Sequence, residues 1–191
     1  QFGGSPFVQL YWDDENEQPA ANNAWFNQQA THPYSVGYDF NHESTHTREL
    51  VKDNLEYWMS EYKIDGFRFD LSKGFTQNNS GDDINAWSEY DQSRVDILLD
   101  YKNHIKSINP NAYVILEHFA NNDEEKALAN EGCLMWADMS TEFGQNTMGW
   151  EENHNFAQAY YANRDFSYPN LIPFMESHDE ERLMFKNLEY G

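Results

Sequence analysis

The chain has 191 residues and a formal net charge of −21, with 33 acidic residues against 12 lysines and arginines. This charge argues against nucleic acid and anionic membranes as partners, because binding to phosphate requires a basic surface. No run of residues approaches the roughly 20 apolar positions of a membrane span. The length suffices for one domain with a hydrophobic core, or for part of a larger one.

The sequence predicts a loop-rich, aromatic subdomain over residues 1–41, followed by alternating helices and strands. Residues 74–89 are polar and predict a loop. Apolar periodicity predicts helices near residues 45–62, 90–107, 123–130 and 153–162, and a partial helix near 181. Short β-like apolar runs predict strands over residues 64–69, 113–116, 133–137 and 171–175.

Alternation of helix and strand predicts an α/β fold with a parallel sheet and right-handed crossovers. None of the strands is followed by Gly-x-Gly-x-x-Gly or by a phosphate loop, which weighs against a nucleotide-binding sheet. A (β/α)8 barrel holds its catalytic residues at the carboxyl ends of its strands. Asp70, Glu117 and Asp179, which follow three of the predicted strands, are placed in this way.

Three of the apolar runs lead into carboxylates, namely Asp70, Glu117 and Asp179. Carboxyl groups at neighbouring strand ends suit glycosidic bond cleavage, in which one carboxylate attacks and another carboxyl group donates a proton. Arg68 lies two residues before Asp70 and so on the same face of the strand, where it would keep that nucleophile ionised and oriented. Glu117 follows an apolar run, which favours it as the proton donor. His118 beside it is a candidate substrate contact.

These stretches resemble regions two, three and four of the α-amylase family, family 13 of the glycoside hydrolases. Residues 65–74, Asp-Gly-Phe-Arg-Phe-Asp-Leu-Ser-Lys-Gly, are similar to its fourth-strand motif, which is highly specific. Residues 115–118, Ile-Leu-Glu-His, resemble the shorter fifth-strand motif, and residues 176–179, Glu-Ser-His-Asp, resemble the seventh-strand motif. The resemblance covers essentially the whole chain. It implies that residues 1–41 are the small domain that follows strand three and that residues 42–191 are part of a (β/α)8 barrel with strands four to seven, since four strands cannot close a barrel.

The resemblance implies a retaining hydrolase of α-linked glucans such as starch or maltooligosaccharides. It implies Asp70 as nucleophile, Glu117 as general acid and base, and Asp179 as the carboxylate that stabilises the transition state. Lys73 and His178 would contact substrate. The family also implies that the protein is secreted, and it allows a structural calcium ion. The chemistry itself requires no cofactor, and no residue is assigned as a metal ligand.

The chain departs from the family pattern in two ways. The first region, an Asp three residues before an Asn-His pair, is not found around Asn41-His42, and Gly74 stands where many amylases carry a histidine. Two alternatives of the same class therefore stay open. The protein could be a transglycosidase, which passes the sugar to another sugar, or a catalytically incomplete fragment that binds sugar.

A competing motif of another class is His42-Glu43-Ser44-Thr45-His46, which matches the His-Glu-x-x-His signature of zinc proteases. Two histidines four residues apart on a helix can bind one zinc ion. The motif lies at a helix start among polar residues, and the positions of its extended form hold Glu49 and Lys52. We interpret it as a solvated helix N-terminus. The single cysteine, Cys133, permits no intrachain disulfide and is expected to be a buried strand thiol.

Overall fold

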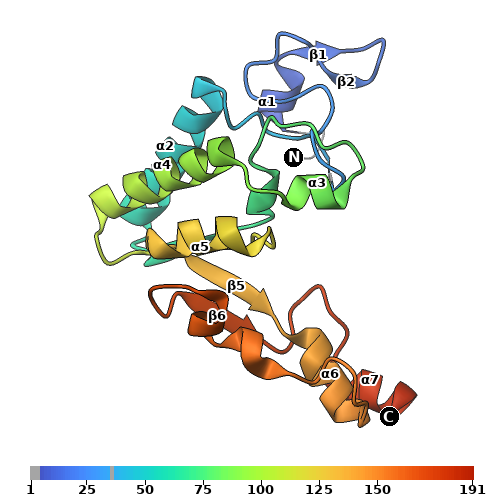
Figure 1. The fold of residues 1–191 in the computed structure, drawn as a ribbon. Coiled ribbons are helices and arrows are strands. Elements are labelled where there is room, and N and C mark those ends of the chain that lie inside the picture. Colours follow the sequence, from blue (N-terminus) through green and yellow to red (C-terminus); the bar gives the residue numbers. More distant parts are fainter. Residues whose placement is uncertain (1–4, 35–36) are drawn as a thin grey trace.

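The computed structural model describes residues 5–34 and 37–191, and Figure 1 shows its fold. The helices are α1 (Pro6–Gln9), α2 (Thr45–Glu61), α3 (Ile84–Ser88), α4 (Gln92–Ile108), α5 (Asn122–Asn130), α6 (Ser140–Met148) and α7 (Leu183–Tyr190). The strands are β1 (Trp12–Asp13), β2 (Gln18–Pro19), β3 (Gly66–Phe69), β4 (Tyr113–Leu116), β5 (Leu134–Asp138) and β6 (Leu171–Phe174). Short 3-10 turns cover Ser72–Gly74, Phe156–Ala159 and Tyr161–Arg164.

The predicted parallel sheet is present. Strands β3, β4, β5 and β6 lie in this order, and each pairs in parallel with the next. The strands follow one another in space as they do in the chain, with a helix in each connection between β3 and β6. This order is the one expected of consecutive strands in a (β/α)8 barrel, and the sheet is consistent with part of one.

The hydrophobic core lies between one face of the sheet and the helices α2, α4 and α5. Buried side chains from β4 and β5 alternate with half-buried ones: Val114, Leu116 and Met135 face the helices, whereas Ile115 and Leu134 belong to the other face. Figure 1 shows α2 and α4 side by side and α5 next to β5, in agreement with their contacts. One face is therefore covered by helices, as the outer face of a barrel is.

Gly66 at the start of β3 allows β3 and β4 to approach closely. A Cβ atom at this position would lie 2.3 Å from the carbonyl oxygen of Tyr113, the residue with which Gly66 is paired. Any other residue would push the two strands apart. Gly132, just after α5, has a φ angle of +95°, the left-handed conformation in which glycine commonly ends a helix.

Residues 5–34 and 37–41 carry little regular structure beyond α1 and the antiparallel pair β1–β2, which lies at the opposite end of the molecule from α6 and α7 (Figure 1). Hydrogen bonds from side-chain hydroxyls to backbone carbonyls connect this segment to the rest of the chain. Thr31 Oγ1 donates to the carbonyl of Thr76 at 2.9 Å, and Thr47 Oγ1 donates to the carbonyl of Trp25 at 3.1 Å. The boundary between a subdomain over residues 1–41 and a barrel segment over residues 42–191 stays a prediction.

Two expectations for the secondary structure were wrong. The polar loop over residues 74–89 contains α3, whose first turn is capped by the Asp83 carboxylate. The helix expected over residues 153–162 is replaced by two 3-10 turns, and α6 forms earlier instead. The residues of α6 are mostly polar and include Gly144, so they show no apolar stripe. This helix forms because it packs against α7.

Candidate active site

The carboxyl ends of β3 and β4 and the middle of β5 bring three side chains into one row. Phe69, Leu116 and Met135 are paired across the sheet, so the next residues, Asp70, Glu117 and Trp136, lie side by side. The amide of Glu117 donates to the carbonyl of Phe69 at 3.0 Å and continues the ladder to this row. The structure thus places Asp70 and Glu117 beside each other at adjacent strand ends.

Arg68 joins the two carboxylates. Its Nη1 donates to Asp70 Oδ1 at 2.6 Å, and its Nη2 donates to Glu117 Oε2. The Asp70 side chain is 74% exposed and Glu117 only 14% exposed, so one carboxylate faces solvent while the other is largely withdrawn from it. Two carboxylates on one guanidinium are held close together and in a fixed orientation.

The surroundings of Glu117 raise its pKa above the ordinary value of 4.5. Burial is the largest cause, the Arg68 cation opposes it, and the nearby Asp70 carboxylate adds to it. A raised pKa keeps part of the Glu117 population protonated at mildly acidic pH. This is the property that a proton donor requires, and it agrees with the role inferred from the apolar run before this residue.

Trp136 on β5 was not among the predicted site residues. The guanidinium of Arg68 lies over its ring, with the Cζ atom 4.1 Å from the ring centroid, and Phe174 packs edge-on against it with ring centroids 5.0 Å apart. Trp136 therefore fixes the plane of the guanidinium that holds both carboxylates. The sequence does carry the signal, because Trp136 stands at the carboxyl end of the strand expected over residues 133–137.

Lys73 and His118 do not join this group. Lys73 is buried, its ammonium donates to the carbonyl of Phe119 at 3.0 Å and to Ser88 Oγ at 3.1 Å, and burial lowers its pKa. Both ring nitrogens of His118 are occupied, Nδ1 by Ser72 Oγ at 2.9 Å and Nε2 by Glu124 Oε1 at 2.7 Å. Both side chains therefore make these polar contacts within the protein.

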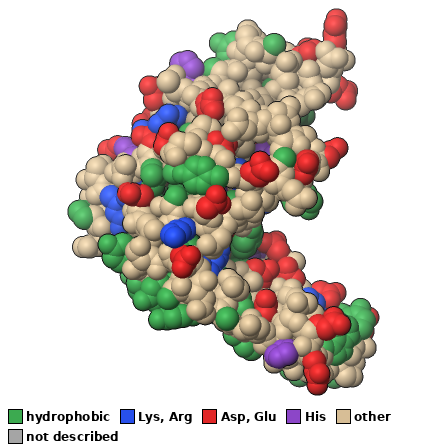
Figure 2. Space-filling model, in the orientation of Figure 1, with side chains coloured by type: hydrophobic (Ala, Val, Ile, Leu, Met, Phe, Trp, Pro, Cys, Tyr) green, Lys and Arg blue, Asp and Glu red, His purple; other side chains and the backbone are tan. Residues whose placement is uncertain are grey.

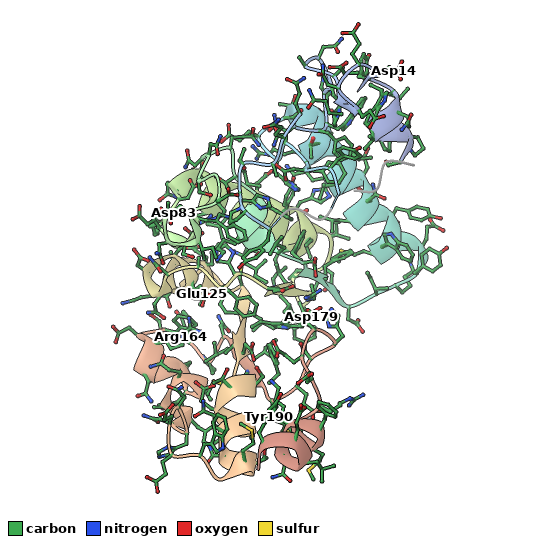
Figure 3. The ribbon with its side chains drawn as sticks, turned by 90° about the vertical axis from the view of Figure 1, so that its right-hand side faces the viewer. Asp14, Asp83, Glu125, Arg164, Asp179 and Tyr190 are labelled. Carbon is green, nitrogen blue, oxygen red and sulfur yellow. The ribbon has the colours of Figure 1, made fainter. Side chains whose placement is uncertain are left out.

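Asp179 and His178 lie on the loop between β6 and α7. They contact each other, with His178 Nε2 3.3 Å from Asp179 Oδ2, and both side chains are more than 60% exposed. Figure 3 shows Asp179 on the opposite side of the view from Arg164 and Glu125. Among the described residues, no hydrogen bond or ion pair joins Asp179 to Asp70 or Glu117.

Glu176, three residues before Asp179, has a clear structural role. Its Oε1 accepts the backbone amide of Leu183 at 2.6 Å and so caps the first turn of α7. The seventh-strand motif is thus anchored to α7 through Glu176, whereas the Asp179 side chain is exposed.

A hollow of about 260 Å³ lies beside Asp70. Its walls come from the irregular N-terminal segment and from the turn after β3, so the two parts of the chain form it together. The lining residues are His32, Tyr34, Tyr38, Asp39, Phe40, His42, Asp70, Leu71, Gly74 and Phe75. Aromatic walls beside a carboxylate suit a ligand that has apolar faces and hydroxyl edges, as a sugar ring has.

The geometry of the His-Glu-x-x-His motif does not support a zinc site. His42 precedes α2, which begins at Thr45, so the two histidines do not share a helix. His42 is buried against Phe75 at a ring-centroid distance of 3.7 Å, its Nδ1 lies 2.9 Å from the hydroxyl of Tyr101, and burial lowers its pKa to about 3. His46 is exposed. Within residues 5–34 and 37–191, no group of three or more His, Cys, Asp or Glu side chains is arranged to hold a metal ion.

The surface agrees with the acidic composition. Figure 2 shows acidic side chains over all parts of the visible face and few lysines or arginines between them. None of the helices in the described part of the chain is long and apolar enough to cross a membrane.

No protein-family model matches the chain. Among curated proteins, it is 47% identical over 37 residues to the glycogen operon protein GlgX homologs of Mycobacterium bovis and Mycobacterium tuberculosis. This match covers 19% of the chain and 5% of each relative.

Among solved structures, the chain is similar to a pullulanase from Anoxybacillus sp. LM18-11, with a TM-score of 0.52 and 20% identity. The match covers 88% of this chain and 25% of the pullulanase chain. The same enzyme complexed with maltotetraose gives a TM-score of 0.51 and 19% identity, and there the match covers 26% of its chain. The chain thus spans about a quarter of the length of these enzymes. Its resemblance to the α-amylase family is confirmed for the fold: over most of its length, this chain folds like part of a pullulanase.

Proposed function

We propose that this chain is part of the catalytic domain of an α-amylase-family glycoside hydrolase that acts on α-linked glucans. The observation that supports this most strongly is the pair of carboxylates, Asp70 and Glu117, bound to one guanidinium at adjacent parallel strand ends. The two groups differ in exposure and electrostatic surroundings, as a nucleophile and a proton donor must. The pullulanase with the same fold binds maltotetraose, which supports an α-1,4-linked oligosaccharide as ligand.

The proposed mechanism is a retaining double displacement. The ionised and exposed Asp70 attacks the anomeric carbon while Arg68 orients it, and Glu117 protonates the leaving oxygen. Glu117, now ionised, then takes a proton from the incoming water, which cleaves the glycosyl–enzyme bond and restores both carboxyl groups. Asp179, whose side chain is exposed, would stabilise the oxocarbenium-like transition state. Secretion and a structural calcium ion remain part of the proposal on the basis of the resemblance alone.

The test compares the unchanged protein with Asp70→Asn and Glu117→Gln on soluble starch and maltotetraose. Loss of the nucleophile should lower turnover by several orders of magnitude, and loss of the proton donor by about 10²–10⁴-fold. The control is Glu151→Gln, an exposed carboxylate outside the site, which should leave turnover unchanged. Near-normal turnover in either amide variant would refute the assigned roles.

Product analysis separates hydrolysis from the alternatives. Maltose and maltotriose without longer products indicate hydrolysis, whereas products longer than the starting maltotetraose indicate transfer to a second sugar. Saturable binding of maltotetraose without any turnover would support the sugar-binding alternative and refute hydrolysis by this chain.

A further inference from the structure

The chain turns sharply directly after Asp70. Leu71 has φ and ψ angles of 44° and 42°, a left-handed conformation that side chains other than glycine, asparagine and aspartate rarely adopt. The same residue lines the hollow beside Asp70. A branched aliphatic residue in this conformation persists only where the surrounding structure holds it there.

The turn binds Glu117 to the segment that carries Asp70. Both the amide and the hydroxyl of Ser72 donate to the carbonyl oxygen of Glu117, each at 2.9 Å. The amide of Leu71 lies 3.4 Å from Glu117 Oε2. Because Phe69 already accepts the amide of Glu117, the main chain of this residue is held on both sides of its Cα atom.

A buried network holds Ser72 from behind. His118 Nδ1 lies 2.9 Å from the Ser72 hydroxyl, and its Nε2 lies 2.7 Å from Glu124. Arg94 donates to both oxygens of Glu124, at 2.6 and 2.8 Å, and its Nη1 donates to the carbonyl of Lys73 at 3.0 Å. The network therefore returns to the backbone of Lys73, the residue after Ser72. The side chains of His118, Glu124 and Arg94 are all buried.

We infer that Leu71 and Ser72 are positioning residues, whose strained turn fixes the Glu117 carboxyl group relative to Asp70. The network of His118, Glu124 and Arg94 keeps the turn in its left-handed form. This inference rests on the proposed function only for its effect on rate, since misplacing a reacting group by about 1 Å costs about 100-fold. It explains why His118, directly beside Glu117, is fully buried and bonded to Ser72 and Glu124.

The test uses two variants of the 191-residue chain and a matched control. Ser72→Ala removes the hydroxyl that reaches Glu117. Leu71→Gly leaves the turn free to relax, because glycine adopts this conformation without strain but does not enforce it. The control is Lys63→Gly, which makes the same kind of change at another left-handed residue, just before the start of β3 and away from the site.

The first measurement is the titration of the Glu117 carboxyl carbon by NMR, with Arg68 and Asp70 as the charged groups that face it. In the unchanged chain, we expect a midpoint above that of an ordinary glutamate. In Ser72→Ala and Leu71→Gly, the midpoint should fall toward the ordinary value, since the carboxyl group gains solvent, and Lys63→Gly should not change it. Unchanged midpoints in both variants would overturn the inference. If Ser72→Ala does not fold, Leu71→Gly decides alone.

The second measurement is turnover of maltotetraose. Both variants should lower kcat by about 10–100-fold with little change in KM, because the substrate still binds while the proton donor is misplaced. An unchanged kcat in both would also overturn the inference. Asp70→Asn separates the two proposals: its full activity would refute the proposed function, whereas the Glu117 titration would still decide the role of the turn.

Discussion

Replacing Arg94 by methionine tests the buried ion network most directly. The Arg94 side chain is 1% exposed, and that of Glu124 is 0% exposed. Besides its two bonds to Glu124, the guanidinium donates to the backbone carbonyls of Lys73, Trp87 and Glu89 at 2.9–3.1 Å. Methionine has a similar length and fills the space, so the change removes charge and hydrogen bonds without opening a large cavity.

The expected loss of stability follows from what remains behind. Removing one partner of a buried ion pair costs about 3–5 kcal/mol, since the other charge is left without compensation. Here Glu124 keeps its bonds to His118 and to the amide of Asp91 at 2.7 Å, which favours the lower end of that range. We therefore expect the free energy of unfolding to fall by about 3 kcal/mol.

The assay is urea unfolding followed by circular dichroism, with Glu124→Gln and the double variant completing a mutant cycle. Burial raises the pKa of Glu124, but hydrogen bonds from His118 and Arg94 outweigh it, so that the pKa lies below the ordinary value of 4.5. A depressed pKa contributes stability that is present above pH 4.5 and is lost as the pH falls through the lowered value. Arg94→Met should therefore lose most stability near neutral pH and less in acid.

Two results would refute this reasoning. A loss below about 1 kcal/mol for Arg94→Met at neutral pH would mean that the buried carboxylate needs no cation beside it. A mutant cycle without coupling between Arg94 and Glu124 would mean that the two residues act independently, in contrast to their short contacts.

Further predictions concern the sheet, the thiol and the site. Gly66→Ala should destabilise the chain by about 1–3 kcal/mol, because its Cβ atom would clash between β3 and β4. Gly144→Ala should stabilise α6 by about 0.5–1 kcal/mol, because its Cβ atom would meet only ordinary contacts at 3.9–4.0 Å. Urea unfolding measures both changes. Cys133 is buried, which raises the pKa of its thiol to about 12, so a thiol reagent should modify it only after unfolding. Arg68→Gln should move the alkaline limb of the kcat/KM profile to higher pH, because this cation lowers the pKa of Glu117, and an unmoved limb would contradict that. Trp136→Ala should lower kcat by freeing the guanidinium plane, and Trp136→Phe should restore most of it.

The sheet could be predicted because its strands carry local signals. The strand expected over residues 113–116 matches β4, and α2 begins within the predicted range at Thr45. Apolar periodicity and turn residues determine such elements within a few residues of sequence. By contrast, α6 depends on packing against α7, about 40 residues later in the chain, and no local pattern in a polar segment with an internal glycine reports that contact.

The site could be predicted only in part, for a related reason. Asp70, Glu117 and Arg68 meet because parallel strands end at one edge, which topology alone determines. By contrast, Lys73 and His118 are buried by residues far away in the sequence, so the sequence did not indicate that their polar groups bond within the protein. The acidic run at the start of α5 shows the same limit. Acidic residues favour a helix N-terminus through the helix dipole, but the sequence does not report that Glu124 is buried against Arg94 or that Glu125 is paired with Arg164.

The carboxylates near the strand ends lie in different surroundings, although the chain as a whole is acidic. Toward the hollow, the Asp70 side chain is exposed and bonded to Arg68. Behind the sheet, Glu124 is neutralised by Arg94 in the core. Between them, Glu117 is bound to both sides, to Arg68 through its carboxylate and to Ser72 through its backbone carbonyl. The buried ion pair of Arg94 and Glu124 is thus connected to Glu117 through the turn at Leu71 and Ser72. A change at that turn should lower the rate of turnover far more than the affinity for the sugar.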